Sequence, residues 1–207
     1  QAELTALRAL GEGTAQAIGD DFFRALVENL ARATAVKSAF VAVFADERTH
    51  ARTLAYWDDG AIIDNITWEL AGTPCEDVLG GELCHHPSGV AVRFPREAGV
   101  ESYLGVPLRD SGGEVMGHLA IFDDRPMPDE PRLLMLFRVF AARAAAELDR
   151  ANIAERLCQS EERFRDLFEE APIAYVHEDL ESRFIRANRA ALRTLGITAA
   201  DVPGMVG

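Results

Sequence analysis

Two short apolar runs in the middle of the chain, separated by a polar segment, constrain the fold more than any other feature. The runs span residues 99–108 and 117–122, and the segment between them reads Arg109-Asp110-Ser111-Gly112-Gly113-Glu114. Apolar runs joined by such turn-forming residues predict a β-hairpin. A long helical pattern begins near Asp129. The sequence therefore predicts a sheet that ends in a hairpin and is followed at once by a helix.

The composition is that of a globular protein with a core of its own. Of the 207 residues, 48% are hydrophobic and 27% are charged. The net charge of −13 argues against a nucleic-acid partner, because phosphate binding requires a basic surface. No apolar run reaches the roughly 18 residues that cross a bilayer, so we expect no membrane partner.

Cysteine usage and the N-terminal sequence indicate the compartment. Three cysteines do not make a disulfide framework, which fits a reducing environment. The N-terminus lacks the basic start and apolar core of a secretory signal. We therefore predict a cytoplasmic protein.

The first part of the chain alternates between helical and β-strand patterns. Residues 1–18 are rich in Ala and Leu and predict an N-terminal helix. Residues 19–35 place apolar side chains at three- and four-residue spacing, which is typical of an amphipathic helix. Three β-prone runs follow, at residues 38–44, 53–57 and 62–70.

A short helix is predicted after these strands. Thr73-Pro74-Cys75-Glu76 has the form of a capping box, in which the Thr73 hydroxyl accepts from the Glu76 amide and the Glu76 carboxylate accepts from the Thr73 amide. Pro74 fits the first helical position, where no hydrogen bond is lost. Gly80-Gly81 ends the predicted helix.

Between Asp129 and about Glu170 little in the sequence stops a helix, which would be far longer than most helices of globular proteins. The alternative is a break near Gln159-Ser160. An apolar stripe follows the helix through Leu134, Phe137, Ala141, Ala144, Leu148, Ala151, Leu157, Phe164 and Leu167. Such a stripe usually packs against a partner helix, so we expect a homodimer through residues 129–170, either parallel or antiparallel. The alternative is a single helix that packs on its own domain, which would account for its first half.

After Pro172 the pattern changes again. Two short strands are predicted at residues 173–177 and 183–188, followed by a helix through Leu195. This segment is too short for a stable core of its own. We therefore interpret residues 171–207 as the start of a second domain.

Two family resemblances cover nearly the whole chain. Residues 22–148 resemble a GAF domain, with core-strand motifs Gly105-Val106-Pro107-Leu108 and Gly117-His118-Leu119-Ala120. Residues 160–172 resemble the helix that opens a PAS domain, and residues 183–190 resemble its second strand and following helix. The expected fold is α+β, an antiparallel GAF-type sheet with flanking helices. The expected organisation is an N-terminal helix (1–18), a GAF sensor domain (19–150), a long exit helix (129–170) and a partial PAS domain (171–207).

The resemblance implies a non-catalytic bacterial sensory module. Such a module binds a small molecule and controls an output domain of the same polypeptide, as in sensor kinases and enhancer-binding transcription activators. Lys37 is the only lysine, so the chain has neither a phosphate-binding loop nor the later lysine of cyclic-nucleotide-binding GAF domains. No cofactor is predicted.

The resemblance also places the ligand pocket, beneath the segment around residues 75–94. The ligand-binding residues predicted on this basis are Cys75, Cys84, His86, Tyr103, Phe122 and Trp57. Strand alternation puts Tyr103, Gly105 and Pro107 on one face of the sheet and Leu104, Val106 and Leu108 on the other. The alternative is that these aromatic residues are ordinary core or surface residues.

A second hypothesis assigns metal or thiol chemistry to Cys75, Cys84, His85 and His86. Thiolate and imidazole are ligands for zinc or iron, and Cys75 and Cys84 could form a reversible disulfide. The predicted helix N-terminus at Cys75 would favour its thiolate. A third hypothesis is a dimerisation module without a ligand. Catalysis would need an orienting group and an oxyanion site that nothing in the sequence identifies, so we predict that the chain is not an enzyme.

Overall fold

The computed structural model describes residues 19–203, 205 and 206, and the chain divides into two units, Gln1–Ala151 and Asn152–Gly207. The helix predicted at residues 1–18 lies outside the described residues. The α+β fold is confirmed, with an antiparallel sheet in the first unit, one long helix and a small sheet in the second unit.

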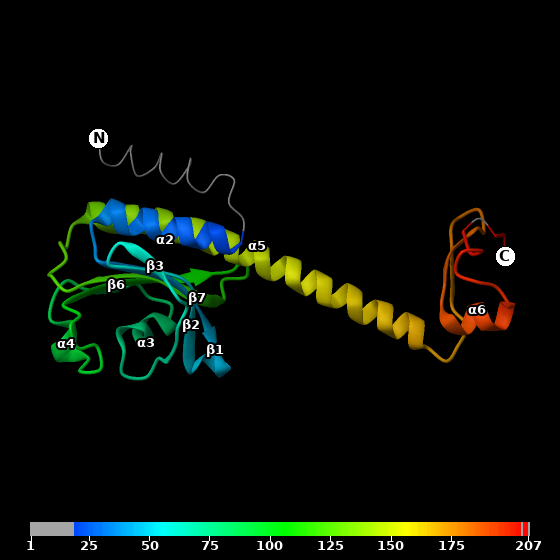
Figure 1. Ribbon diagram of the computed structural model, residues 1–207, viewed down its shortest axis with the longest axis horizontal. Coiled ribbons are helices and arrows are strands. Elements are labelled where there is room, and N and C mark those ends of the chain that lie inside the picture. Colours follow the sequence, from blue (N-terminus) through cyan, green and yellow to red (C-terminus); the bar gives the residue numbers. More distant parts are fainter. Residues whose placement is uncertain (1–18, 204, 207) are drawn as a thin grey trace. The chain divides into compact units, whose positions relative to one another are not determined.

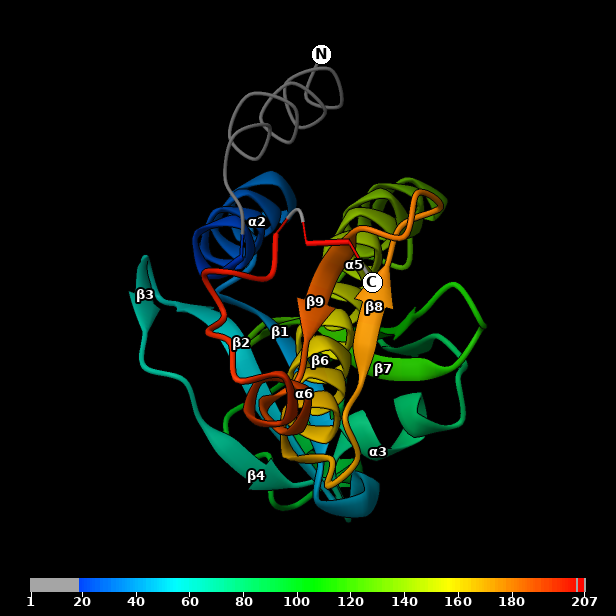
Figure 2. The ribbon, with the colours of Figure 1, turned by 90° about the vertical axis from the view of Figure 1, so that its right-hand side faces the viewer.

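The first unit is built on a seven-stranded sheet with the order β3-β2-β1-β7-β6-β5, in which β4 also pairs with β2. All of its pairings are antiparallel. Figure 2 shows β3 and β4 beside β2 at one edge of the sheet. The predicted hairpin is confirmed as the β6–β7 pair. The strands are β1 (Ser38–Ala45), β2 (His50–Asp58), β3 (Ala61–Ile63), β4 (Thr67–Glu69), β5 (Cys84–His86), β6 (Ser102–Arg109) and β7 (Val115–Asp123).

Two helices cover one face of this sheet (Figure 1), namely α2 (Asp20–Thr34) and the first half of α5 (Pro131–Glu170). The predicted amphipathic face of α2 is confirmed. The face of the sheet itself is formed by alternate residues of the central strands, because successive strand side chains point to opposite sides. The largest members of this core are Phe22, Phe23, Leu26, Leu30, Leu104, Leu108, Leu119, Ile121, Phe137 and Phe140.

The other face of the sheet lies against two short helices, α3 (Pro74–Leu79) and α4 (Val90–Arg93), and the loops around them (Figure 1). A short 3-10 helix, η1 (Asp46–Arg48), joins β1 to β2. This face has a core of its own. In each central strand, the residues of this core alternate with those that pack against α2 and α5. Its members include Phe40, Ala42, Ala51, Leu70, Cys75, Val78, Cys84, Val90, Phe94, Tyr103 and Ala120.

The single strand predicted at residues 62–70 is wrong, because the structure divides it into β3 and β4. The division lies opposite an irregularity in β2, where the register with β1 shifts between Val41 and Ala42. There the Thr53 hydroxyl accepts a hydrogen bond from the Ile66 amide at 2.8 Å, and the Thr53 amide donates to the Ile66 carbonyl at 2.9 Å. A side-chain hydroxyl thus takes the place of a ladder partner and interrupts the strand.

The helix predicted at Thr73 is present as α3, with Pro74 in its first turn, but its capping box is wrong. The Thr73 hydroxyl donates to the Leu70 carbonyl at 2.7 Å, so it does not cap α3. The Glu76 carboxylate accepts instead from the Gly72 amide at 2.9 Å, one residue earlier than predicted. Gly72 has a φ of +73°, a conformation that glycine adopts without strain.

The long helix is confirmed as α5, which continues without a break from Pro131 to Glu170. It begins two residues after Asp129, at a proline that suits the first turn of a helix. Its first half is buried on the sheet, whereas large apolar residues of its second half are exposed. No described helix is long and apolar enough to cross a membrane.

The second unit contains the end of α5, an antiparallel pair of strands and one further helix. These are β8 (Val176–Glu178), β9 (Phe184–Ala187) and α6 (Arg189–Leu195). All three elements predicted after Pro172 are present, but β8 begins three residues later than the strand predicted at residues 173–177. Asn188 is fully buried and connects them. Its side-chain oxygen accepts from the Tyr175 and Ala191 amides, both at 2.9 Å, and thereby caps α6 and holds the segment before β8.

Candidate functional site

An aromatic cavity lies on the α3 side of the sheet, the face opposite α2 and α5. Its volume is about 280 Å³. The Phe40 ring lines it and contacts three other rings, with centroid distances of 5.4 Å to Trp68, 5.8 Å to Tyr56 and 6.1 Å to Phe122. These rings come from β1, β2, β4 and β7 and form an apolar wall. The full lining is Phe40, Thr53, Tyr56, Ile66, Trp68, Glu69, Thr73, Pro74, Cys75, Arg96, Glu97, Val100, Tyr103 and Phe122.

Tyr103 connects the sheet to α3 at this cavity. Its hydroxyl donates to the Cys75 thiol at 3.4 Å, and both groups are buried. The ring lies across Gly105, where an added Cβ would be 2.8 Å from two ring carbons. A glycine is therefore required at this position for the ring to lie flat on the strand.

The thiol chemistry predicted for Cys75 is not supported by its surroundings. Burial raises the pKa of the Cys75 thiol to about 12, with only a partial opposing effect from the Tyr103 hydrogen bond. The same burial raises the pKa of Tyr103 well above its usual value. The sequence predicted a favoured thiolate from the N-terminus of α3, but removal from water has the larger effect.

Two acidic residues and one arginine provide the charged groups of the cavity lining. Arg96 Nη1 donates to the Glu69 carboxylate at 3.0 Å and to the Ala71 carbonyl at 2.8 Å, which accounts for both of its N–H groups. Burial raises the pKa of Glu97, against the opposing charge of Arg96. Within residues 19–203, 205 and 206, the Glu97 carboxylate has no hydrogen-bond partner. Burial is the main reason why the pKa of Tyr56 is raised to about 12, and the negative charge of Glu97 contributes to this rise.

His118 is fully buried among the same aromatic residues but does not line the cavity. Its ring stacks on Phe44 at 5.5 Å and meets the edge of Phe40 at 5.2 Å. Neither ring nitrogen has a hydrogen-bond partner in the described part of the chain. Burial lowers the pKa of His118 to about 3, so the imidazole is neutral at physiological pH.

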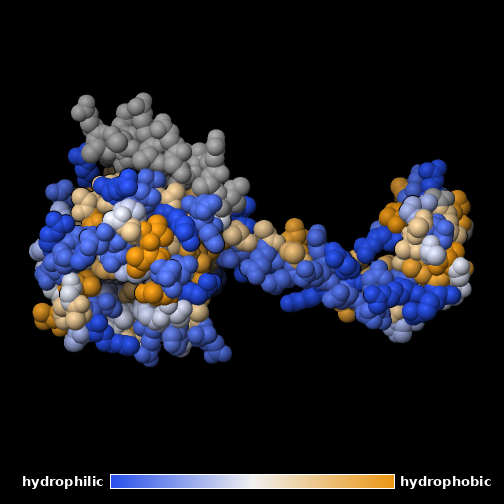
Figure 3. Space-filling model, in the orientation of Figure 1, coloured by the Kyte–Doolittle hydropathy of each residue, from blue (hydrophilic) through white to orange (hydrophobic). Residues whose placement is uncertain are grey.

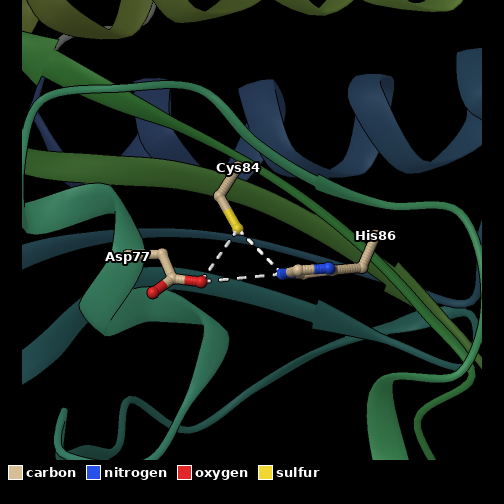
Figure 4. A group of neighbouring side chains, drawn as sticks. All are labelled: Asp77, Cys84 and His86. Atoms are coloured by element: carbon tan, nitrogen blue, oxygen red, sulfur yellow. Dashed lines mark hydrogen bonds and ion pairs between the residues drawn. The ribbon is translucent and has the colours of Figure 1, made fainter. Parts of the chain in front are cut away.

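A second group of chemically active side chains lies beside the cavity, where Asp77 of α3 meets Cys84 and His86 of β5 (Figure 4). The Cys84 sulfur is 3.2 Å from His86 Nε2 and 3.8 Å from Asp77 Oδ2. His86 Nε2 is 3.7 Å from the same Asp77 oxygen. Burial, with a further contribution from Asp77, raises the pKa of Cys84 to about 12. Burial lowers the pKa of His86.

The structure brings together only part of the predicted site. Cys75, Tyr103 and Phe122 line the cavity, whereas Cys84 and His86 belong to the neighbouring group. Two other predicted residues, Trp57 and His85, lie outside both the cavity lining and the Asp77–Cys84–His86 group.

Trp57 packs in the core between the sheet and α2, with the Arg32 guanidinium 5.6 Å from its ring centroid, because its position in β2 faces the helices. His85 alternates with its strand neighbours, and its Nδ1 lies 3.4 Å from Asp129. We therefore include neither residue in the candidate site.

A larger hollow of about 390 Å³ lies elsewhere in the first unit, between the end of α2 and the loop before α5. Arg125, Glu130 and Arg132 line it, as does the Asp123 carboxylate. That carboxylate already accepts from the Lys37 amide at 2.9 Å and from the Arg125 amide at 3.0 Å and Arg125 Nε at 3.1 Å. No described aromatic side chain lines this hollow, so it lacks the ring-lined wall that makes the first cavity the candidate site.

Sequence reasoning missed several residues of the site, among them Phe40, Trp68, Glu97 and Asp77. The alternation in β1 could have placed Phe40 beside Ala42 on the ligand side, since both follow from period-two patterning. Asp77 gave no signal, because it reaches Cys84 and His86 only through the fold.

Comparisons with known proteins agree with this architecture. The GAF domain family matches residues 19–148, and the PAS domain family matches residues 162–206. No curated protein sequence matches the chain.

Solved structures show the same fold at low sequence identity. The chain is similar to the GAF domain from the Acinetobacter phosphoenolpyruvate-protein phosphotransferase, with a TM-score of 0.62, 15% identity, and coverage of 75% of this chain and 98% of that one. It is also similar to the chromophore-binding domain of Stigmatella aurantiaca bacteriophytochrome, with a TM-score of 0.58, 12% identity, and coverage of 71% and 60%.

A third similar structure is the R. palustris bacteriophytochrome RpBphP3, with a TM-score of 0.58, 12% identity, and coverage of 80% of this chain and 40% of that one. The chain thus spans less than two thirds of the phytochrome chains that it matches. Because the family match covers well over half of the chain and the sheet has the same fold as solved GAF domains, the chain belongs to the GAF domain family, and its GAF domain is followed by part of a PAS domain.

Proposed function

We propose that this chain senses a small molecule in the aromatic cavity and relays its binding through α5 to an output domain of the same polypeptide. GAF and PAS domains are typically non-catalytic sensory modules. The observation that carries the proposal is the cavity itself. Its aromatic wall and half-buried Glu97 are characteristic of a site for an organic ligand.

The cavity suggests the chemistry of this ligand. A volume of about 280 Å³ suits a molecule smaller than the drug-sized ligands that fill cavities of roughly 300–1,000 Å³. The Phe40, Tyr56 and Trp68 rings favour an aromatic or cationic partner. Glu97 offers an unbonded carboxylate, which favours a hydrogen-bond donor or a positive group. We therefore propose a small aromatic amine or a similar donor-bearing ring.

The proposal is tested with Trp68 as a fluorescent reporter. The chain has two tryptophans, and replacing Trp57 with Phe leaves only the one that lines the cavity. The variant is titrated with small aromatic amines and with their neutral counterparts. We expect a saturable fluorescence change, and we expect the amines to bind with higher affinity than their neutral counterparts. Absence of any saturable change at millimolar concentration would overturn the proposed ligand class.

The relay follows from the two faces of β7. Ala120 and Phe122 face the cavity side, whereas Leu119 and Ile121 pack in the core with α5. A ligand that displaces β7 therefore changes the surface on which α5 packs. Allostery of this kind requires two arrangements that the ligand binds unequally.

The second half of α5 supports a homodimer. Its exposed apolar residues Ile153, Leu157, Phe164 and Leu167 follow a spacing of four, seven and three residues, which fits the a and d positions of a heptad repeat. Figure 3 shows such hydrophobic patches on an otherwise hydrophilic helix surface. Unpaired, these side chains would remain in water, and a second copy of the helix would bury them.

We expect Leu157→Glu to convert the dimer to a monomer, because it places a charge in the apolar seam of both helices. Gln159→Glu is the matched control, since it adds the same charge at an exposed position outside the seam. Light scattering at micromolar concentration measures the mass. A monomeric parent chain, or equal effects of the two variants, would contradict dimerisation through α5.

A further inference from the structure

We propose that Asp77, Cys84 and His86 bind one zinc ion, with a fourth position left open to water or to an exogenous ligand. The site is separate from the aromatic cavity, and its occupancy does not depend on the small molecule proposed above. Neither Asp77 nor this combination of ligands follows from the sequence. The donor set is a carboxylate, a thiolate and an imidazole, all of which are common zinc ligands in proteins.

The separations of the three ligand atoms fit a tetrahedral zinc ion. A tetrahedral zinc ion with a Zn–S distance of about 2.3 Å and Zn–N and Zn–O distances of about 2.0–2.1 Å holds its ligand atoms about 3.3–3.6 Å apart. The three atoms here are separated by 3.2, 3.7 and 3.8 Å. Each separation agrees with the tetrahedral value to within about 0.4 Å. Movements of that size are available to rotations of the side chains.

The three atoms converge on one point and do not form a chain (Figure 4). A Cys-His-Asp proton relay would place Asp77 against the far nitrogen of the imidazole, Nδ1. Asp77 instead faces Nε2, the same nitrogen that faces the Cys84 sulfur. This arrangement does not form a Cys-His-Asp proton relay, but its three ligand atoms surround a position that a cation could occupy.

The charge of the ligand set also fits a divalent cation. A carboxylate and a thiolate carry two negative charges, which a zinc dication neutralises. The one described cation near this group is Arg93, whose guanidinium lies 3.8 Å from Asp77 Oδ2 and whose side chain is 63% exposed. Arg93 also lies over the Phe94 ring at 5.4 Å, so it can stay there when a metal takes its place beside Asp77.

The local fold holds the ligands in place. Cys84 and His86 are two residues apart on β5 and therefore share one side of the strand. The Phe94 ring packs against the His86 ring at 5.4 Å. The turn between α3 and β5 is fixed at Gly81, whose carbonyl accepts from Arg109 Nη2 at 2.8 Å. Asp77 is 45% exposed, so the fourth position of the metal faces solvent.

The experiment is a Co²⁺ titration of the chelator-treated full chain, followed by competition with Zn²⁺. It uses the Cys158→Ser background, because Cys158 is exposed and could bind metal by itself. We expect one Co²⁺ per chain, a thiolate-to-cobalt charge-transfer band and the visible bands of four-coordinate cobalt. Zinc should abolish these bands by displacement.

The variants separate the ligands from their neighbours. Cys84→Ser should abolish the charge-transfer band, and Asp77→Asn and His86→Gln should weaken metal binding by about 100-fold or more. Cys75→Ser removes a thiol from the same layer and should leave the band unchanged. Arg93→Gln should bind metal more tightly, since a positive charge beside Asp77 is lost.

The proposal is overturned if the parent chain shows no charge-transfer band, if the band survives in Cys84→Ser, or if Cys75→Ser removes it. Asp77→Asn keeps the test independent of folding, because Asp77 is half-exposed and its replacement should leave the circular dichroism spectrum unchanged. Failure here would leave the Trp68 titration unaffected, so the two proposals fail separately.

Discussion

Replacing Gly117 with alanine is expected to lower the free energy of unfolding by about 3 kcal/mol. Gly117 lies in β7 opposite Val43 of β1 and Leu108 of β6. A Cβ at this position would collide with the Ala42 carbonyl oxygen and lie 2.9 Å from the Val43 Cα atom. These are backbone atoms of a strand that is hydrogen-bonded on both sides, so they cannot move without breaking the centre of the sheet.

The matched control for this substitution is Gly80→Ala. At Gly80 the nearest atom to an added Cβ is the Asp77 carbonyl oxygen at 3.7 Å, an ordinary contact. We expect a change within about 0.5 kcal/mol there. Urea denaturation measures both variants. Equal midpoints for Gly117→Ala and the parent chain would show that the contact between β1 and β7 is looser than described.

Acidification from pH 7 to pH 5 is expected to cost about 2 kcal/mol of stability through His118 alone. The folded chain holds this imidazole neutral, with a pKa of about 3, because it is buried without a partner. In the unfolded chain its pKa returns to about 6.5. Between these values the unfolded state binds the extra proton, so stability rises with pH from about 3 to about 6.5 and is fully present above that range.

His118→Phe should remove this part of the pH dependence, since a phenyl ring fits among Phe40, Phe44 and Trp68 and does not titrate. The matched control is His50→Phe in the same unit, where the histidine is 39% exposed. Denaturation midpoints between pH 5 and pH 7 measure the effect. If stability depended on pH equally in His118→Phe and the parent chain, the loss of stability on acidification would not be due to His118.

Much of the fold could be predicted from local patterns. Alternation in 99–122 predicted the β6–β7 hairpin and assigned Tyr103 and Leu104 to opposite faces, and the structure confirms both. The three- and four-residue spacing of α2 predicted its buried side. These features depend on neighbours in sequence, so a one-dimensional pattern is enough to find them.

The failures have physical causes that lie outside local sequence. The Thr53 hydroxyl replaces a ladder partner and divides a predicted strand into β3 and β4. Trp57 is aromatic and lies on β2, so the sequence placed it in the ligand pocket. The pairing of β2 with β1 decides which face of the sheet each β2 side chain lies on, and it places the Trp57 ring against α2.

The candidate site shows the same limit more strongly. Cys84 and His86 could be found as a pair, since they are two residues apart on one strand. Asp77 could not, because it approaches them only after Gly80 and Gly81 turn the chain from α3 into β5. The opposite error concerns Cys75, where the sequence showed a helix N-terminus but not the burial that raises the pKa of its thiol to about 12.

The most direct test of a ligand in the aromatic cavity is the Trp68 titration repeated with Val100→Phe added to the Trp57→Phe variant. Val100 lines the cavity, and a phenyl ring there would occupy the space of the ligand. Val92→Phe is the control, because Val92 is 88% exposed and outside the lining. We expect binding of a small aromatic amine to be at least about tenfold weaker in Val100→Phe and unchanged in Val92→Phe. Equal affinities in the two variants would place the ligand outside the aromatic cavity and contradict the proposed function.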